Sequence, residues 1–255
     1  MDFDLFKKVA LEIYQHDPDT EVWATIMGEV FTKKDLIFRY ISFAKNEAKL
    51  KKFNINTNLV MFDPSYIDQM EESNLNKLTV GLDAASQETY DQIRVGGNFE
   101  KVESNVWAIL NEKKRGRLKN LELILQFIVQ ENNIHEENTF IERWKGAGAT
   151  IKIRQKLGWG VGVEANNLCI SEQQRKIPCP WLMRTMSVHW TGEIAQCDAE
   201  WNGDQYVGDL RQQTIEEVWL GQLLEKRKRH LVNDFDMVPC RDCKDWQCGR
   251  AELYV

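Results

Sequence analysis

The hydrophobic residues of this chain switch repeatedly between a helical and an extended spacing. Apolar side chains recur every three or four residues in four segments, which predicts amphipathic helices at 3–15, 33–48, 98–115 and 136–148. Shorter apolar or alternating runs predict strands at 21–28, 52–58, 77–83, 122–129 and 150–155. Strands that alternate with helices are typical of βαβ units, so the sequence predicts an α/β fold with a mainly parallel sheet.

The pattern changes near residue 160. All six cysteines and three of the five prolines lie beyond that point. One helix is predicted there, because Thr214 and Glu217 form a T-x-x-E capping box ahead of an apolar stripe. We therefore expect two domains, a larger one at 1–160 and a small domain organised by cysteines at 161–255.

Composition and charge exclude some classes of partner. The net charge of −6 argues against broad binding to nucleic acid, and the basic runs at 113–119 and 226–230 are interpreted as solvated helix faces and loops. No apolar run reaches the about 18 residues of a membrane helix, and the N-terminus lacks a signal-peptide pattern. The sequence thus predicts a cytoplasmic protein without nucleic-acid or membrane partners.

Clustered cysteines in a reducing compartment predict a metal site rather than disulfides. Cys240 and Cys243 form a C-x2-C pair, a spacing that lets two thiolates converge on one metal or cluster. We expect the other two ligands to be Cys179 and Cys197, which flank a strand–turn–strand pattern with Gly192 in its turn. Four thiolates then close around one site.

Zinc and a [4Fe-4S] cluster both accept four thiolates. A structural zinc ribbon usually has two C-x2-C knuckles, and the single one here favours iron–sulfur. Cys169 and Cys248 remain as extra cysteines; each is either a further ligand or a buried thiol that packs as a small hydrophobic side chain.

Motifs along the chain resemble those of the radical S-adenosylmethionine (radical SAM) family. "MGEVFTKKDL" at 27–36 resembles the G-E-P segment after the second barrel strand, and "INTN" at 55–58 resembles the T-N after the third. "VGLDAASQETYDQIRVGGNFEKVESNV" at 80–106 resembles the S-L-D…Y…I-R-x-G run of the fourth strand and its helix. C-x12-G-x4-C at 179–197, "VGDLRQQTIEEVW" at 207–219 and the C-x2-C pair resemble a SPASM or Twitch auxiliary-cluster domain.

The resemblance implies a partial (β/α) barrel at 1–160 and a SPASM/Twitch domain at 161–255. It also implies an oxidoreductase or modifying enzyme that uses S-adenosylmethionine and an auxiliary [4Fe-4S] cluster. The same resemblance implies S-adenosylmethionine contacts at the carboxyl ends of the strands, from Gly28 and Glu29 at the amine, Asp83 and Arg94 near the ribose or carboxylate, and Asn58 and Gln126. Most of these assignments have an alternative without a ligand. Gly28 and Glu29 would form a polar turn, and Asp83 and Arg94 would act as a helix cap and a surface ion pair. Gln126 would point outward from its strand.

Three departures from the family pattern matter. No C-x3-C-x2-C motif is present, because the first cysteine is Cys169, so we expect the chain to begin one strand and one loop later than its relatives. Val30 replaces the usual Pro and Gly81 the usual Ser.

The alternative function is a non-catalytic binding protein that carries iron–sulfur or zinc.

The sequence does not identify catalytic residues or the substrate, which is a small molecule or a peptide. We also expect self-association, because the strand at 21–28 would lie at an exposed edge of a parallel sheet.

Overall fold

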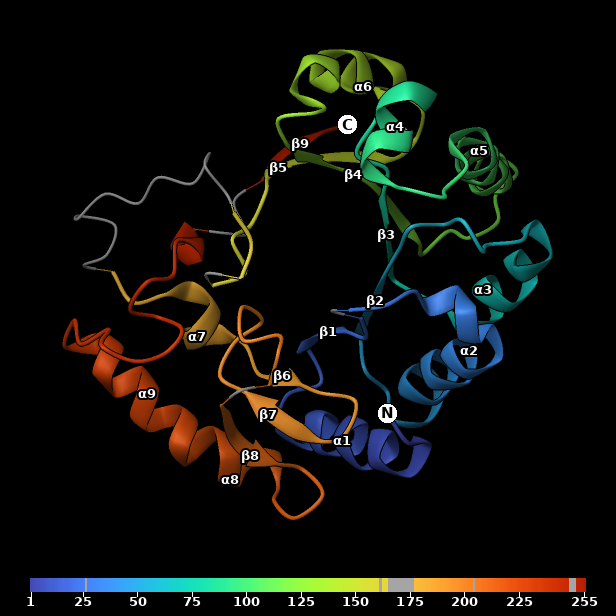
Figure 1. Cartoon of the computed structure of the whole chain (residues 1–255). Helices are drawn as coiled ribbons and strands as arrows, with labels where there is room; N and C mark the ends of the chain where they lie inside the picture. Colours follow the sequence, from blue (N-terminus) through green and yellow to red (C-terminus); the bar gives the residue numbers. More distant parts are fainter. Residues whose placement is uncertain (26, 161, 165–176, 204, 248–250) are drawn as a thin grey trace. The chain divides into compact units, whose positions relative to one another are not determined.

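The computed structural model describes most of the chain and divides it by contacts into two compact units (Figure 1). The sheet unit comprises Tyr14–Arg154 and Ala251–Val255, and the cysteine unit comprises Met1–Ile13 and Gln155–Arg250. The residues described are 1–25, 27–160, 162–164, 177–203, 205–247 and 251–255.

The sheet unit is built around a six-stranded sheet in the order β1-β2-β3-β4-β5-β9 (Figure 1). Strands β1 to β4 pair in parallel, and β9 pairs antiparallel with β5. The bounds are β1 Glu21–Trp23, β2 Lys52–Thr57, β3 Lys77–Gly81, β4 Glu122–Val129, β5 Thr150–Gln155 and β9 Glu252–Tyr254. The prediction of an α/β fold with a mainly parallel sheet is confirmed.

β2 and β3 end one and two residues before the predicted bounds of 52–58 and 77–83, and two other strands differ more. β1 has three residues rather than the eight predicted at 21–28. The last residues of the chain, which the sequence analysis placed in the second domain, form β9 on the edge of the sheet. Its three residues are too few to show an alternating pattern, so periodicity could not predict it.

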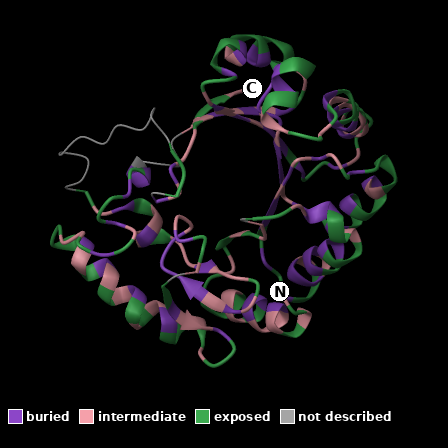
Figure 2. Ribbon diagram, in the orientation of Figure 1, coloured by how far each residue is buried: buried purple, intermediate pink, exposed green. Residues whose placement is uncertain are grey.

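Helices cover one face of this sheet and leave the other face without helices of this unit (Figure 1). The strands contribute fully buried residues such as Ile55, Leu78, Val80 and Leu125 to the core. Figure 2 marks buried segments along the strands and along the helices that cover them. The helices are α2 Lys34–Ser42, α3 Ile67–Ser73, α4 Gln87–Ile93, α5 Phe99–Lys114 and α6 Glu137–Trp144. The sequence analysis did not predict α3 and α4, whose seven residues span about two turns.

The cysteine unit combines a three-stranded antiparallel sheet with short helices. β6 and β7 form the predicted hairpin, with Gly192 at φ +108° in the turn. The predicted capping box of Thr214 and Glu217 is also present, but the expected single helix is divided at Gly221 into α8 and α9. The bounds are α7 Pro180–Arg184, β6 Ser187–Val188, β7 Glu193–Ala195, β8 Tyr206–Asp209, α8 Ile215–Leu220 and α9 Gln222–Leu231.

Most of α1 (Phe3–His16) packs in the cysteine unit rather than against the sheet that follows it in sequence. The Lys8 ammonium donates to the carbonyl oxygens of Leu210 and Gln213, each at 2.6 Å. Glu12 accepts a hydrogen bond of 2.7 Å from the backbone N–H of Ile215 at the start of α8. The sequence analysis had assigned this helix to the domain at 1–160.

Candidate cofactor and cluster sites

Gly28 and Glu29 form a turn between β1 and α2. The Glu29 carboxylate accepts hydrogen bonds from the Thr57 hydroxyl at 2.7 Å, the Asn58 N–H at 2.7 Å and the Phe31 N–H at 3.1 Å. It therefore ties this turn to the carboxyl end of β2. A carboxylate has about four lone-pair positions, so three donors leave one for an ammonium group. Thr57 completes this arrangement and was not among the predicted residues.

Asp83 follows β3 and is almost fully buried, with 2% of its surface exposed. Its Oδ1 accepts a hydrogen bond of 2.7 Å from the Ile128 N–H, and its Oδ2 pairs with the Arg94 guanidinium at 2.5 Å. Asn133, also missed from the sequence, donates to the backbone oxygens of both Asp83 and Ile128 at 2.9 Å. The cap of α4 is Ser86, so the alternative role of Asp83 as a helix cap is wrong.

Burial raises the pKa of Asp83, and the Arg94 guanidinium and the Ile128 N–H oppose that rise. Both carboxylate oxygens are engaged inside the protein, whereas the Arg94 side chain is 32% exposed. Asp83 thus orients Arg94, and Arg94 presents the charge that a ligand could meet.

Gly81 leaves room for that guanidinium. A Cβ at this position would lie 2.8 Å from an Arg94 nitrogen. This close approach explains locally why Gly stands here in place of the Ser that is usual in the family. Gly81 pairs in register with Gln126 of β4, so their side-chain positions point to the same face of the sheet. Gln126 therefore faces the side on which Arg94 lies.

The structure groups the six predicted cofactor residues into two sets. Gly28, Glu29 and Asn58 lie at the ends of β1 and β2. Asp83 and Arg94 lie at the end of β3, and Gln126 lies within β4 opposite Gly81, the last residue of β3. Ligands of parallel α/β sheets bind beyond the carboxyl ends of the strands, where both sets lie.

The four predicted metal ligands are buried in the cysteine unit, and each is a free thiol. Cys179 precedes α7, Cys197 follows β7, and Cys240 and Cys243 follow α9. Burial raises the pKa of Cys197, and the charges of the other three cysteines raise it further. Burial likewise raises the pKa of Cys243 to about 12, with contributions from Cys179 and Cys240. The charges of these four cysteines thus influence one another inside the cysteine unit.

The four cysteines match the ligand chemistry of a [4Fe-4S] cluster, in which each iron takes one thiolate. In the part of the chain that the structure describes, no three His, Cys, Asp or Glu side chains lie close enough to hold one metal ion. Zinc needs four sulfurs about 2.3 Å from one point, whereas a [4Fe-4S] cluster gives each cysteine its own iron and spreads the thiolates apart. A bound cluster would also favour the thiolate forms that burial alone disfavours.

Polar groups that the sequence analysis missed surround these thiols. The Gln196 amide approaches the Cys240 sulfur at 3.4 Å, and the Asp245 N–H approaches the Cys243 sulfur at 3.3 Å. His230 accepts a hydrogen bond of 3.3 Å from the Cys179 N–H. No motif spacing marks these residues, because their contacts arise only when separate segments pack. Cys169 and Cys248 lie outside the described residues.

The interpretation of 226–230 as a solvated face is wrong for two of its residues. Arg227 and His230 are buried, and burial lowers the pKa of His230 to about 4. The Arg227 guanidinium stacks 3.6 Å over the ring of Trp219 and donates to the Leu182 carbonyl at 2.9 Å. Two residues of this basic run therefore belong to the buried interior of the cysteine unit.

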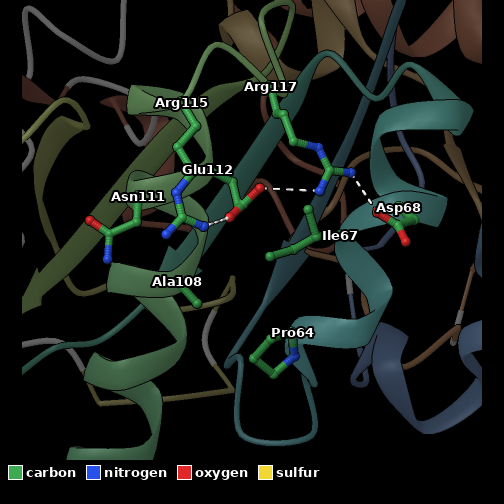
Figure 3. Close-up of a pocket in the computed structure, with 8 residues that line it drawn as sticks. All are labelled: Pro64, Ile67, Asp68, Ala108, Asn111, Glu112, Arg115 and Arg117. Carbon is green, nitrogen blue, oxygen red and sulfur yellow. Dashed lines mark hydrogen bonds and ion pairs between the residues drawn. The ribbon is translucent and has the colours of Figure 1, made fainter.

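The basic run at 113–119 borders a pocket of about 290 Å³ on the helical face of the sheet unit (Figure 3). Arg117 pairs with Asp68 at 2.5 Å and with Glu112 at 3.1 Å, and Arg115 pairs with Glu112. The pocket holds none of the predicted site residues, and these arginines already have carboxylate partners.

Two family models match this chain. Residues 1–119 match the radical SAM superfamily, and residues 179–244 match SPASM, an iron-sulfur cluster-binding domain. The chain carries a radical SAM domain and a SPASM domain. The SPASM match begins at Cys179 and contains all four predicted cluster ligands.

Several solved structures share the fold at low sequence identity. BtrN in complex with AdoMet and 2-DOIA aligns with a TM-score of 0.59 at 13% identity, covering 95% of this chain and 80% of BtrN. anSMEcpe with bound AdoMet aligns with a TM-score of 0.65 at 10% identity, covering 96% and 82%. Streptococcus suis SuiB bound to the precursor peptide SuiA aligns with a TM-score of 0.68 at 11% identity, covering 96% and 63%.

A search of curated protein sequences finds no match to this chain. Within the described ranges, no helix has the length and apolar character needed to span a membrane.

Proposed function

We propose that this chain forms the S-adenosylmethionine-binding sheet and the auxiliary-cluster domain of a radical SAM enzyme that modifies a small molecule or a peptide. The observation that carries the proposal is the set of four buried thiols inside the SPASM match, on a chain whose N-terminal part matches the radical SAM superfamily. When bound, S-adenosylmethionine and its iron–sulfur partner supply one-electron chemistry.

The residues of the sheet unit would hold the cofactor at the carboxyl ends of the strands. Glu29 would accept the methionyl ammonium through its remaining lone pair, while Thr57 and Asn58 keep its carboxylate in place. Arg94, fixed by Asp83, would face the carboxylate or ribose. Gln126 lies on the same face and would line the pocket.

Cys179, Cys197, Cys240 and Cys243 would hold the auxiliary [4Fe-4S] cluster. Four thiolates give every iron a protein ligand, so the site favours electron transfer or a structural role over direct binding of substrate. Electron transfer would make the enzyme an oxidoreductase.

The structural relatives support both substrate classes. BtrN is bound to the small molecule 2-DOIA, whereas anSMEcpe and SuiB are bound to peptides. BtrN and anSMEcpe each bind AdoMet together with a second molecule, and we extend only this pairing to the present chain.

The test is anaerobic expression of the full reading frame that encodes this chain, followed by iron and sulfide analysis and an assay for 5′-deoxyadenosine. We expect iron and sulfide in the protein and 5′-deoxyadenosine upon reduction with S-adenosylmethionine. Glu29→Gln keeps the shape of the side chain but removes its charge, so this variant should retain iron and lose most product.

An iron-loaded protein whose full reading frame contains C-x3-C-x2-C and yields no 5′-deoxyadenosine would favour the non-catalytic binding protein. A colourless protein with zinc in place of iron would reject the auxiliary cluster.

A further inference from the structure

The face of the sheet opposite the helices carries many polar and charged side chains, with Trp23 and Ile124 among them. On β5, Ile151 and Ile153 are buried in the core, so the alternation of the strand places Lys152 and Arg154 on the other face. Lys77 of β3 lies on that face too, since it forms ion pairs with residues of β1 and β4. We define the polar face by Glu21, Asn54, Lys77, Thr79, Glu122, Gln126, Lys152 and Arg154.

Positive charge near this face exceeds negative charge, because four cations stand against three carboxylates. The cations are Lys77, Arg94, Lys152 and Arg154, and the carboxylates are those of Glu21, Asp83 and Glu122. Lys77 pairs with Glu21 at 3.3 Å and with Glu122 at 3.4 Å, which uses both carboxylates. Within the described residues no ion pair is formed by Lys152, whose side chain is half-buried. Burial lowers the pKa of Lys152, and the charges of Arg154 and Lys77 lower it further against a smaller opposing effect of Glu21.

Thr79 provides a second, independent observation. It is 2% exposed, and its hydroxyl has no hydrogen-bond partner in the described part of the chain. Thr79 lies two residues from Lys77 and two from Gly81, so it points to the polar face. A buried hydroxyl without a partner is uncommon in folded proteins and indicates a ligand or water that completes it.

We propose that Lys152, Thr79 and Arg154 bind an anionic group of the substrate, a carboxylate or a phosphate, on the polar face of the sheet. An anion there would neutralise the excess ammonium charge and accept the Thr79 hydroxyl proton. The assignment rests on the proposed function, because it takes this face as the side where the substrate lies. Substrates whose only charged groups are amines do not fit it.

The site is separate from the groups assigned to S-adenosylmethionine. Arg94 follows α4 and is fixed by Asp83 at the carboxyl end of β3. Lys152 is the third of six residues in β5 and lies further from the carboxyl edge. The carboxylate of S-adenosylmethionine is nevertheless an anion, so the test must distinguish it from a substrate anion.

The experiment measures binding of inorganic phosphate and of acetate to the full chain by calorimetry, with and without saturating S-adenosylmethionine. The variants are Lys152→Met, Lys152→Arg and Thr79→Val, with the exposed Lys119→Met as the control. We expect Lys152→Met to weaken binding of the preferred anion at least tenfold and Thr79→Val to weaken it several-fold. Lys152→Arg and Lys119→Met should remain within about threefold of the parent, and S-adenosylmethionine should not displace the anion.

Thermal unfolding supplies a second readout. A lysine with a purely structural role would be destabilising to remove, whereas removal of an excess cation relieves repulsion. We therefore expect Lys152→Met without ligand to be at least as stable as the parent chain.

Equal anion affinity in Lys152→Met and the parent would overturn the proposal, as would complete displacement of the anion by S-adenosylmethionine. A Lys152→Met variant that is less stable without ligand would also count against it. None of these measurements depends on 5′-deoxyadenosine formation. A negative result would therefore reject the anion site without rejecting the proposed function, which the 5′-deoxyadenosine assay tests separately.

Discussion

At the scale of single residues, the buried pair of Asp83 and Arg94 shows how a motif residue can act through its neighbour. The carboxylate is enclosed by the protein and the guanidinium is partly exposed. Removing the cation would leave an unpaired buried charge, which costs more than the pair itself contributes.

We predict that Arg94→Ala destabilises the sheet unit by roughly 2 to 3 kcal/mol, because Asp83 then loses the partner that offsets its burial. The double variant Asp83→Asn with Arg94→Ala should recover part of this loss. Urea unfolding followed by circular dichroism measures both. A double variant no more stable than Arg94→Ala would contradict a role of the cation in compensating Asp83.

Glu136 offers a residue-scale test with pH. Its carboxylate accepts hydrogen bonds from the Ala85 N–H at 2.6 Å and the Ser86 hydroxyl at 2.5 Å. Burial acts to raise the pKa of Glu136, but these donors outweigh it and the pKa is lowered. The ionised form is therefore the one that stabilises the loop between β3 and α4.

We predict that Glu136→Gln costs roughly 1 to 2 kcal/mol at pH 7. Because the folded pKa lies below the unfolded value of about 4.3, the contribution is complete above that pH. It is lost as the pH falls through the folded pKa, so the difference from the parent should shrink in acid. Urea unfolding between pH 7 and 3 measures this, with the exposed Glu142→Gln as control. If the stability difference between Glu136→Gln and the parent grew as the pH fell, the ionised form of Glu136 would not be the stabilising one.

At the scale of elements, α1 illustrates a helix whose partners lie about 200 residues away in the chain, as the separation of 203 residues between Glu12 and Ile215 shows. The apolar stripe of α1 predicts that one face of the helix is buried, but it does not identify the segment against which that face packs. The contacts of Lys8 and Glu12 with the segment that leads into α8 decide it.

We predict that Glu12→Ala destabilises α8 by about 1 kcal/mol, because the Ile215 N–H loses a charged acceptor. Hydrogen exchange of the α8 backbone amides should accelerate accordingly. Asp4→Ala on the same helix is the matched control, since Asp4 pairs with Lys7 on the surface and such pairs contribute little. Equal acceleration in the two variants would show that the Glu12 contact is not what stabilises α8.

At the scale of the whole molecule, metal and fold are coupled in the cysteine unit. The unit has short strands and short helices around its four thiols, so a bound cluster should supply much of its stability.

We predict that Cys243→Ala loses iron and sulfide together with the fold of the cysteine unit, whereas Cys248→Ala keeps both. The four thiols of the candidate site already complete a cluster, which leaves no iron for another cysteine. Metal analysis and visible absorption of anaerobically purified variants measure this. If Cys248→Ala lost its iron while Cys240→Ala kept it, the proposed set of four cluster ligands would be wrong.

Self-association also belongs to this scale and stays a prediction. β1 is the outer strand at one end of the sheet order, and an edge strand presents unpaired backbone groups that can pair with another chain.

Local pattern in the sequence determined the alternation of strands and helices, the hairpin at Gly192, the capping box and the spacing of the four cysteines. Each of these depends on residues within a few turns of one another, where side-chain periodicity and turn chemistry act directly. The bounds of β4 and β5 follow this pattern residue for residue.

Tertiary structure alone decided which distant groups meet. Hydrogen bonds join Glu29 to Thr57, Asp83 to Ile128, and His230 to Cys179. They form because separate segments pack together and their buried polar groups need hydrogen-bond partners. The docking of α1, the added strand β9 and the excess charge at Lys152 have the same origin. Periodicity records which side of an element is apolar, whereas the partner of each side is set by packing across the whole chain.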